Sequence, residues 1–142
     1  MKILTEIINF LERSSNLIKE VRDEKDLQKI ISMNIGAITG KIMCVENMPC
    51  MEIDIFKDGE GVEVKLNRRF YEGFCQAYAI RAIFKEIKTA VLHVKNGVSQ
   101  EEINAISLLA KELDIPTVVF DMLNGKVVYY YNPKEQKFLE NF

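Results

Sequence analysis

Apolar residues along the chain follow two periods, one typical of helices and the other typical of strands. Helical spacing, with start signals such as the capping box Ser99-x-x-Glu102, predicts four helices. Alternating or continuous apolar runs, bounded by turn signals such as Asp58-Gly59 and Asn124-Gly125, predict six strands. The expected order is helix 2–13, a helix starting at 23, strands 42–45, 52–56 and 62–66, helix 69–87, strand 90–94, helix 99–113, and strands 117–120 and 126–131.

Strands that alternate with helices after residue 66 predict an α/β fold, in which helices pack on the faces of a mixed sheet. The helix at 69–87 is apolar on most sides, which predicts a buried helix. A length of 142 residues is that of one ordinary domain, so residues 1–142 are expected to form a single domain. No apolar run reaches 18 residues and no secretory signal is recognisable, so we expect a soluble protein without a membrane partner.

The numbers of cysteines and histidines and the net charge narrow the possible kinds of functional site. The three cysteines, Cys44, Cys50 and Cys75, are odd in number and form no Cys-x-x-Cys pair, which argues against a disulfide framework or a zinc site and favours the cytoplasm. The single histidine, His93, lies in an apolar strand and is expected to be a packed strand residue. A net charge of −2 excludes a strongly basic protein that coats DNA, but not a local basic patch.

The clearest candidate chemistry lies on the hairpin formed by the second and third predicted strands. A two-residue turn at 58–59 places residues whose numbers sum to 117 opposite each other, so that Asp54 faces Glu63 and Glu52 faces Lys65. Since side chains alternate in a strand, these four polar residues share one face. Directly opposed Cβ atoms lie about 4.5–5.5 Å apart, so two carboxylates and a lysine converge. The apolar residues share the other face: Ile53, Ile55, Val62, Val64 and Leu66.

An amphipathic hairpin with a solvated outer face is one explanation of this pattern. It does not explain why Asp54 stands opposite Glu63, because like charges that face each other destabilise a sheet. A divalent cation between the carboxylates would reverse the sign of that interaction, and Mg²⁺ prefers carboxylate, water and phosphate oxygens. A bulge at Glu60-Gly61 would change the register and the opposed pairs.

Asp54 followed by Glu63-Val64-Lys65 resembles the D…(D/E)xK signature of the PD-(D/E)xK nuclease superfamily, which includes restriction endonucleases, archaeal Holliday-junction resolvases and RecB-like nucleases. The core of that family is a helix, a three-stranded meander, a helix and a further strand, similar to the order predicted for residues 23–95. Gln76 and Tyr78 are similar to a glutamine and tyrosine that many RecB-like members carry on the second core helix, although their spacing is shorter here.

Two positions depart from the family pattern or leave it open. The residue before Asp54 is Ile53, where the family has proline. A glutamate on the first core helix, which many members have, would be Glu24 or, less well placed, Glu20.

The resemblance implies a restriction-endonuclease-like fold and a metal-dependent deoxyribonuclease that hydrolyses phosphodiester bonds. Asp54 and Glu63 would bind Mg²⁺ or Mn²⁺, and Lys65 would orient or activate the attacking water or stabilise charge on the phosphate. Gln76 would orient the nucleophile or a coordinated water. Three nearby cations would hold the DNA backbone, unless they are ordinary solvated surface residues: Arg68, Arg69 and Lys57.

Two other functions stay open. The chain could be a non-catalytic DNA-binding or assembly module that keeps the nuclease fold, or an unrelated α/β regulatory or ligand-binding domain with Glu63 and Lys65 on its surface. A homodimer is compatible with either nucleic-acid function, since one such domain covers few phosphates. Tyr129-Tyr130-Tyr131 is more typical of a core or interface strand than of a base-stacking site.

Overall fold

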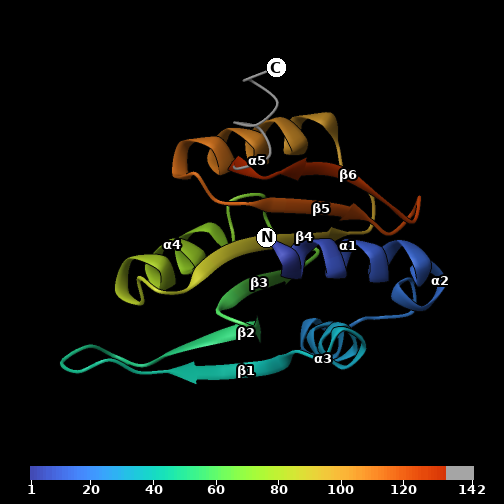
Figure 1. Ribbon diagram of the computed structural model, residues 1–142. Coiled ribbons are helices and arrows are strands. Elements are labelled where there is room, and N and C mark those ends of the chain that lie inside the picture. Colours follow the sequence, from blue (N-terminus) through green and yellow to red (C-terminus); the bar gives the residue numbers. More distant parts are fainter. Residues whose placement is uncertain (134–142) are drawn as a thin grey trace, which may run out of the picture.

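The six predicted strands form one mixed sheet in the computed structural model, which describes residues 1–133 (Figure 1). The strands lie side by side in the order in which they occur in the sequence. The pairs β3–β4 and β4–β5 are parallel, and the pairs β1–β2, β2–β3 and β5–β6 are antiparallel. Their bounds are Ile38–Met43 (β1), Met51–Lys57 (β2), Glu60–Leu66 (β3), Lys88–Lys95 (β4), Thr117–Asp121 (β5) and Lys126–Tyr131 (β6).

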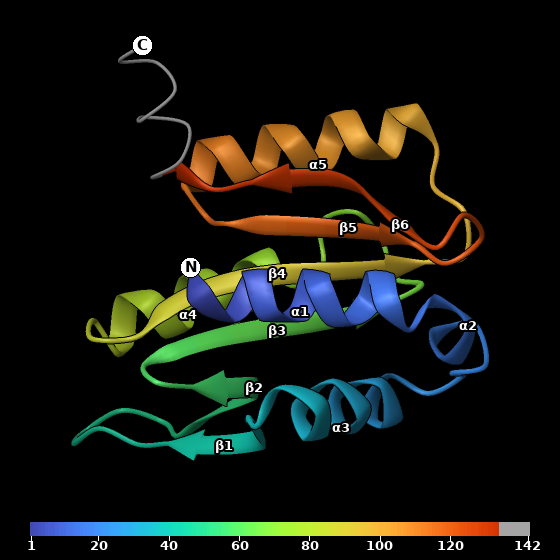
Figure 2. The same ribbon diagram turned by 45° about the vertical axis from the view of Figure 1, so that its right-hand side comes forward.

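Five helices within residues 1–133 cover the two faces of the sheet (Figures 1 and 2). α1 (Lys2–Arg13), the short α2 (Ser15–Ile18) and α3 (Glu24–Ile35) lie on one face, and α4 (Phe74–Ile83) and α5 (Gln100–Leu113) on the other. The predicted start signals operate as expected, because Ser99 and Glu102 form the reciprocal capping box of α5. None of these helices is both long and apolar enough to cross a bilayer.

Each face of the sheet carries its own hydrophobic core. The larger core joins α1, α2 and α3 to alternate residues of the central strands, with α1 running roughly along the strands in front of β3 and β4 (Figure 2), and Val127 and Tyr130 of β6 pack against the same cluster. The smaller core joins Phe74 and Ala77 of α4 and Ile106 of α5 to the opposite face of β4 and β5. A third cluster closes the α4 side near β2, with Ile53, Ile80, Phe84 and Ile87.

The predicted helix at 69–87 is wrong at both ends, because α4 ends at Ile83 and also starts later than expected. α4 begins only at Phe74, and Gly73 before it has a φ of +93°, outside the helical region. Phe70 and Phe74 stand four residues apart, so their spacing imitated one continuous helical face. The expectation of a helix buried on most sides also fails, since Phe70 and Tyr78 are exposed.

The hairpin register is confirmed near the turn and wrong further from it. Ile55 pairs with Val62 and Lys57 with Glu60, as expected, but the ladder between β2 and β3 ends at Ile55–Val62. Glu52 therefore does not face Lys65 and instead forms an ion pair with Lys25 of α3 (2.8 Å). Ile53 packs on the α4 side while Ile55 packs on the α1–α3 side, so these two residues do not share a face. β2 pairs with β1 along its length and diverges from β3 at Asp54.

The connection between β1 and β2 contains a disulfide that the cysteine count did not predict. Cys44 and Cys50 are joined across this loop, and Cys75 is free and exposed. An odd total leaves one thiol over but does not prevent two others from pairing within one short loop. The absence of Cys-x-x-Cys spacing was therefore a poor argument against a disulfide, and it gives no support to a cytoplasmic location. β1 also lies earlier than the expected strand 42–45 and ends before Cys44.

Candidate active site

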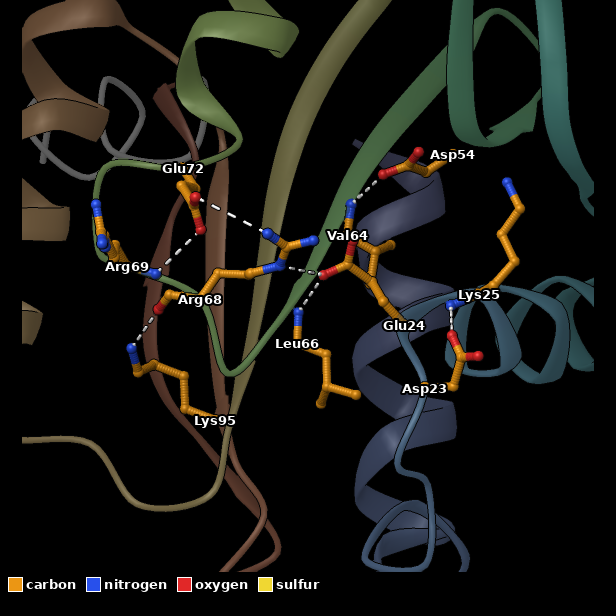
Figure 3. A network of polar contacts seen from close by, with 10 residues as sticks. All are labelled: Asp23, Glu24, Lys25, Asp54, Val64, Leu66, Arg68, Arg69, Glu72 and Lys95. Atoms are coloured by element: carbon orange, nitrogen blue, oxygen red, sulfur yellow. Dashed lines mark hydrogen bonds and ion pairs between the residues drawn. The ribbon is translucent and has the colours of Figure 1, made fainter.

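The site is built at the point where β2 diverges from β3 and leaves two backbone amides of β3 without a strand partner. Residues two apart in a strand direct their amides to the same edge, so Val64 and Leu66 both present N–H groups to this gap. Val64 N donates to Asp54 Oδ2 (2.9 Å), and Leu66 N donates to Glu24 Oε2 (2.8 Å) (Figure 3). Carboxylates from β2 and from the first turn of α3 therefore replace the missing carbonyls, and both are fixed beside β3.

Glu63 lies on the opposite face of β3 from Val62 and Val64, next to Asp54. Its side chain is buried, with 3% of the residue exposed, and Oε1 has no hydrogen-bond partner. Burial, then the charge of Asp54 and a hydrogen bond that a protonated Glu63 can donate to it, raise the pKa of Glu63 to about 9, against a smaller lowering effect of Lys65. At neutral pH the Glu63 carboxyl therefore holds a proton unless another positive charge reaches it.

Lys65 follows on the same face and is also buried, with 8% exposed. A Cβ placed on Gly73, the residue that precedes α4, would lie 3.2 Å from Lys65 Cγ and 3.0 Å from Val91 Cγ1. The backbone entering α4 therefore covers the aliphatic stem of Lys65 and restricts its position. Burial of both Glu63 and Lys65 contradicts a fully solvated hairpin face, and the reason is that α4 covers it.

Gly73→Ala is expected to lower the free energy of unfolding by roughly 1–3 kcal/mol, since it adds a Cβ at a φ of +93° against Lys65 and Val91. Gly59→Ala is the control, because Gly59 also has a positive φ, +77°, but open space around its Cβ position. Chemical denaturation should show the larger loss for Gly73→Ala. In a double-mutant cycle the loss should shrink in the Lys65→Ala background; an unchanged loss would show that Gly73 does not restrain Lys65.

Two further residues of β4 line the same face. His93 pairs in register with Lys65, is fully buried and lies near the ring of Phe74 (centroids 6.1 Å apart). Burial, followed by the charge of Lys95, lowers the pKa of His93 to about 4, so the imidazole is neutral at physiological pH. This confirms the expected packed histidine.

Lys95 is the residue that sequence reasoning missed. It is 7% exposed, donates to the backbone oxygen of Arg68 (2.7 Å) and forms an ion pair with Glu102 of α5 (2.5 Å). The sequence did contain a signal for this role, because Lys95 directly follows the apolar run of a central strand, and a charged side chain buried there needs partners.

The other predicted site residues divide into two groups. Glu24 reaches the site and also pairs with Arg68 (3.3 Å), so it, and not Glu20, is the glutamate that lies beside β3. Gln76 is exposed in the first turn of α4, and no hydrogen bond within the described chain joins it to Asp54, Glu63 or Lys65. Its expected role, to orient the nucleophile or a coordinated water, stays a prediction. Lys57 is bound by Glu6 (2.8 Å) and by the Ile35 carbonyl (2.6 Å), which makes it a structural lysine.

The donor set suits a divalent cation that is completed by water and substrate. Within residues 1–133 no three acidic, histidine or cysteine side chains form a ready metal cluster. Asp54 and Glu63 supply two carboxylates, one of them with a buried, unpartnered oxygen. Mg²⁺ is commonly held by one or two carboxylates together with waters and a phosphate. Two carboxylates therefore suit this cation, but they are too few for a cation whose ligands all come from the protein.

Comparison of the chain with models of protein families, with curated proteins and with solved structures gives no match.

Proposed function

We propose that the chain is a divalent-cation-dependent deoxyribonuclease with a restriction-endonuclease-like core. The observation that carries this proposal is the convergence of Asp54, Glu63 and Lys65 where β2 leaves β3. The unpartnered oxygen of Glu63 supports it, because a buried carboxylate next to another one is stable as an anion only with an added positive charge. The element order from α3 through β1, β2, β3 and α4 to β4 is consistent with the family that the D…ExK pattern resembles.

Each residue of the proposed site has its own role in phosphodiester hydrolysis. In the reaction a water oxygen bonds to phosphorus while the bond from phosphorus to a sugar oxygen breaks. Asp54 and Glu63 would hold Mg²⁺ or Mn²⁺, which when bound polarises the phosphate and eases ionisation of the attacking water. Lys65, with its stem covered by Gly73, presents a fixed ammonium that donates to that water or to a phosphate oxygen. The backbone N–H of Val64 on β3 fixes Asp54 by the hydrogen bond of 2.9 Å.

A second candidate is a non-catalytic DNA-binding or assembly module with the same core. The observation that favours it is burial, because Glu63 and Lys65 are almost inaccessible to a substrate phosphate in this conformation. In that case the Glu63 carboxyl would remain protonated and hydrogen-bonded to Asp54, and its role would be structural.

A nuclease assay separates these functions. Wild-type protein is incubated with single-stranded, duplex and branched DNA, with Mg²⁺ or Mn²⁺ or with EDTA, beside Glu63→Gln and the exposed control Glu112→Gln on α5. We expect cation-dependent cleavage by the wild type and by Glu112→Gln, and none by Glu63→Gln. DNA binding without cleavage would support the second candidate, and neither binding nor cleavage would refute both.

A further inference from the structure

The segment between β3 and α4, residues 67–73, lies close to Lys65 at both of its ends. It leaves β3 two residues after Lys65, and its last residue, Gly73, lies over the stem of the same lysine. We call this segment the aromatic loop. Any nucleic acid that reaches Lys65 therefore passes close to it, and its side chains bear on which DNA the site accepts.

Contacts to β4 and its continuation hold the aromatic loop, among them the hydrogen bond from Lys95 that Figure 3 shows. The Lys95 ammonium binds the Arg68 carbonyl (2.7 Å), and Asn67 donates its backbone N–H to the Val94 carbonyl (2.8 Å). Asn67 Oδ1 accepts from Asn96 N (2.7 Å), and Asn67 adopts a φ of +52°. A buried lysine that anchors a loop carbonyl restricts that loop before any ligand arrives.

Two aromatic rings stand exposed on this fixed loop. Phe70 is 39% exposed and Tyr71 46%, and their rings meet edge to face with centroids 5.3 Å apart. Arg69 Nη1 donates to the Tyr71 hydroxyl (2.7 Å), which fixes the second ring beside a guanidinium. Large adjacent rings that remain in water on a rigid segment offer a face on which planar groups can stack.

Two arginines lie beside the rings and can contact the phosphates of a nucleic acid, but acidic neighbours weaken one of them. Arg68 and Arg69 are both exposed, but Glu24 and Glu72 lie near Arg68 and reduce its attraction for phosphates. The chain as a whole carries −2. Phosphate contacts alone are therefore weak here, and base stacking, worth about 1–3 kcal/mol per base, has to supply much of the affinity.

We propose that the aromatic loop binds unpaired nucleotides, so that the substrate of the neighbouring site is single-stranded DNA or an opened duplex end. The rings of Phe70 and Tyr71 lie at 89° to each other, so each stacks on one base of a strand whose neighbouring bases are not parallel, and Arg68 and Arg69 contact the phosphates between them. Bases inside an intact duplex do not present their faces, so a blunt duplex offers only the outer faces of its two terminal base pairs and gains less from the rings than a single strand. This inference deepens the proposed nuclease function and rests on it for the role of the bound strand.

The test measures binding without catalysis. Fluorescence anisotropy in EDTA compares a labelled oligothymidylate with a blunt duplex of equal length, for the wild type, Phe70→Leu, Tyr71→Leu, Tyr71→Phe and the exposed control Leu108→Ala on α5. We expect tighter binding of the single strand, a loss of roughly 5- to 150-fold for each ring removed, and near wild-type binding by Tyr71→Phe and Leu108→Ala. Thermal denaturation verifies that every variant is folded.

Each result supports or overturns the inference. Equal affinity for both DNA forms, or unchanged binding by both leucine variants, overturns it even if cleavage depends on Glu63. A leucine variant that changes the oligomeric state in sedimentation and leaves DNA binding intact also overturns it, in favour of a protein interface. Ring-dependent binding of the single strand without any cleavage supports the loop inference and refutes the nuclease proposal instead.

Discussion

Glu63→Gln is expected to remove most of the pH dependence of stability between about pH 7 and pH 9 in metal-free protein, the range in which His93, with a folded-state pKa of about 4, is neutral in both the folded and the unfolded state. The pKa of Glu63 is raised from 4.5 to about 9, so the folded state holds a proton that the unfolded state releases. The stabilisation is complete below about pH 4.5 and is lost as the pH rises through the folded pKa. The free energy of unfolding of the wild type should fall by up to about 1.4 kcal/mol per pH unit in this window.

Divalent cations are expected to reverse that loss in the wild type and not in Glu63→Gln. A cation between the carboxylates replaces the proton, so Mg²⁺ or Mn²⁺ should stabilise the wild type more at about pH 9 than at about pH 6. Asp54→Asn should also abolish the cation response and flatten the pH dependence, because the charge of Asp54 contributes to the raised pKa.

Chemical denaturation at several pH values, with EDTA or with the cation, measures both effects. The exposed variant Glu112→Gln serves as control. If the free energies of unfolding of the wild type and Glu63→Gln change with pH in parallel, Glu63 does not hold a proton in the folded state. The proposed metal site then loses its main support.

Lys65→Met is expected to reduce cleavage by a factor on the order of 10²–10³ or more while leaving the fold intact. Methionine keeps an unbranched side chain under Gly73 but has no ammonium to donate to the reacting groups. Lys65→Ala tests the role of the ammonium less cleanly, because Lys65 is buried. Lys65 is 8% exposed, so alanine also removes packing of the stem and should destabilise the protein by roughly 1–3 kcal/mol.

Single-turnover cleavage, measured together with thermal denaturation, distinguishes the two roles of Lys65. Lys88→Met, at an exposed position at the start of β4, is the matched control and should cleave like the wild type. Cleavage by Lys65→Met within about tenfold of the wild type would exclude the ammonium from the chemistry. A lost thermal transition would mark Lys65 as structural.

The order of elements and the local pairing were predictable because they depend on short-range signals. The turn at Asp58-Gly59 fixes the pairs next to it, and the capping box fixes the start of α5. The convergence of Asp54 with Glu63 was predicted from an ideal hairpin. In the structure it arises differently, because the strands separate there and Val64 N binds the Asp54 carboxylate directly.

The parts that sequence reasoning missed depend on contacts between distant segments. The divergence of β2 follows from its pairing with β1 and the packing of Ile53 against Ile80 and Phe84, which no local pattern reveals. The anchoring of Arg68 by Lys95 links residues 27 apart. The pairing of Cys44 with Cys50 depends on how close the loop brings them, and the residue count carries no such information.

The packing of α1 against the last strand has a consequence for the order of folding. Ile3, Leu4, Ile7 and Leu11 of α1 are fully or almost fully buried, partly by a core that includes residues of β5 and β6. A ribosome makes α1 more than a hundred residues before β6. Hairpins between neighbouring strands close short loops and can form early, but α1 completes its packing only after the last strand exists. Until β5 and β6 are made, part of the apolar face of α1 therefore lacks its partners, although α3 and β3 can already pack against the rest, and this open part is where a chaperone would bind the nascent chain.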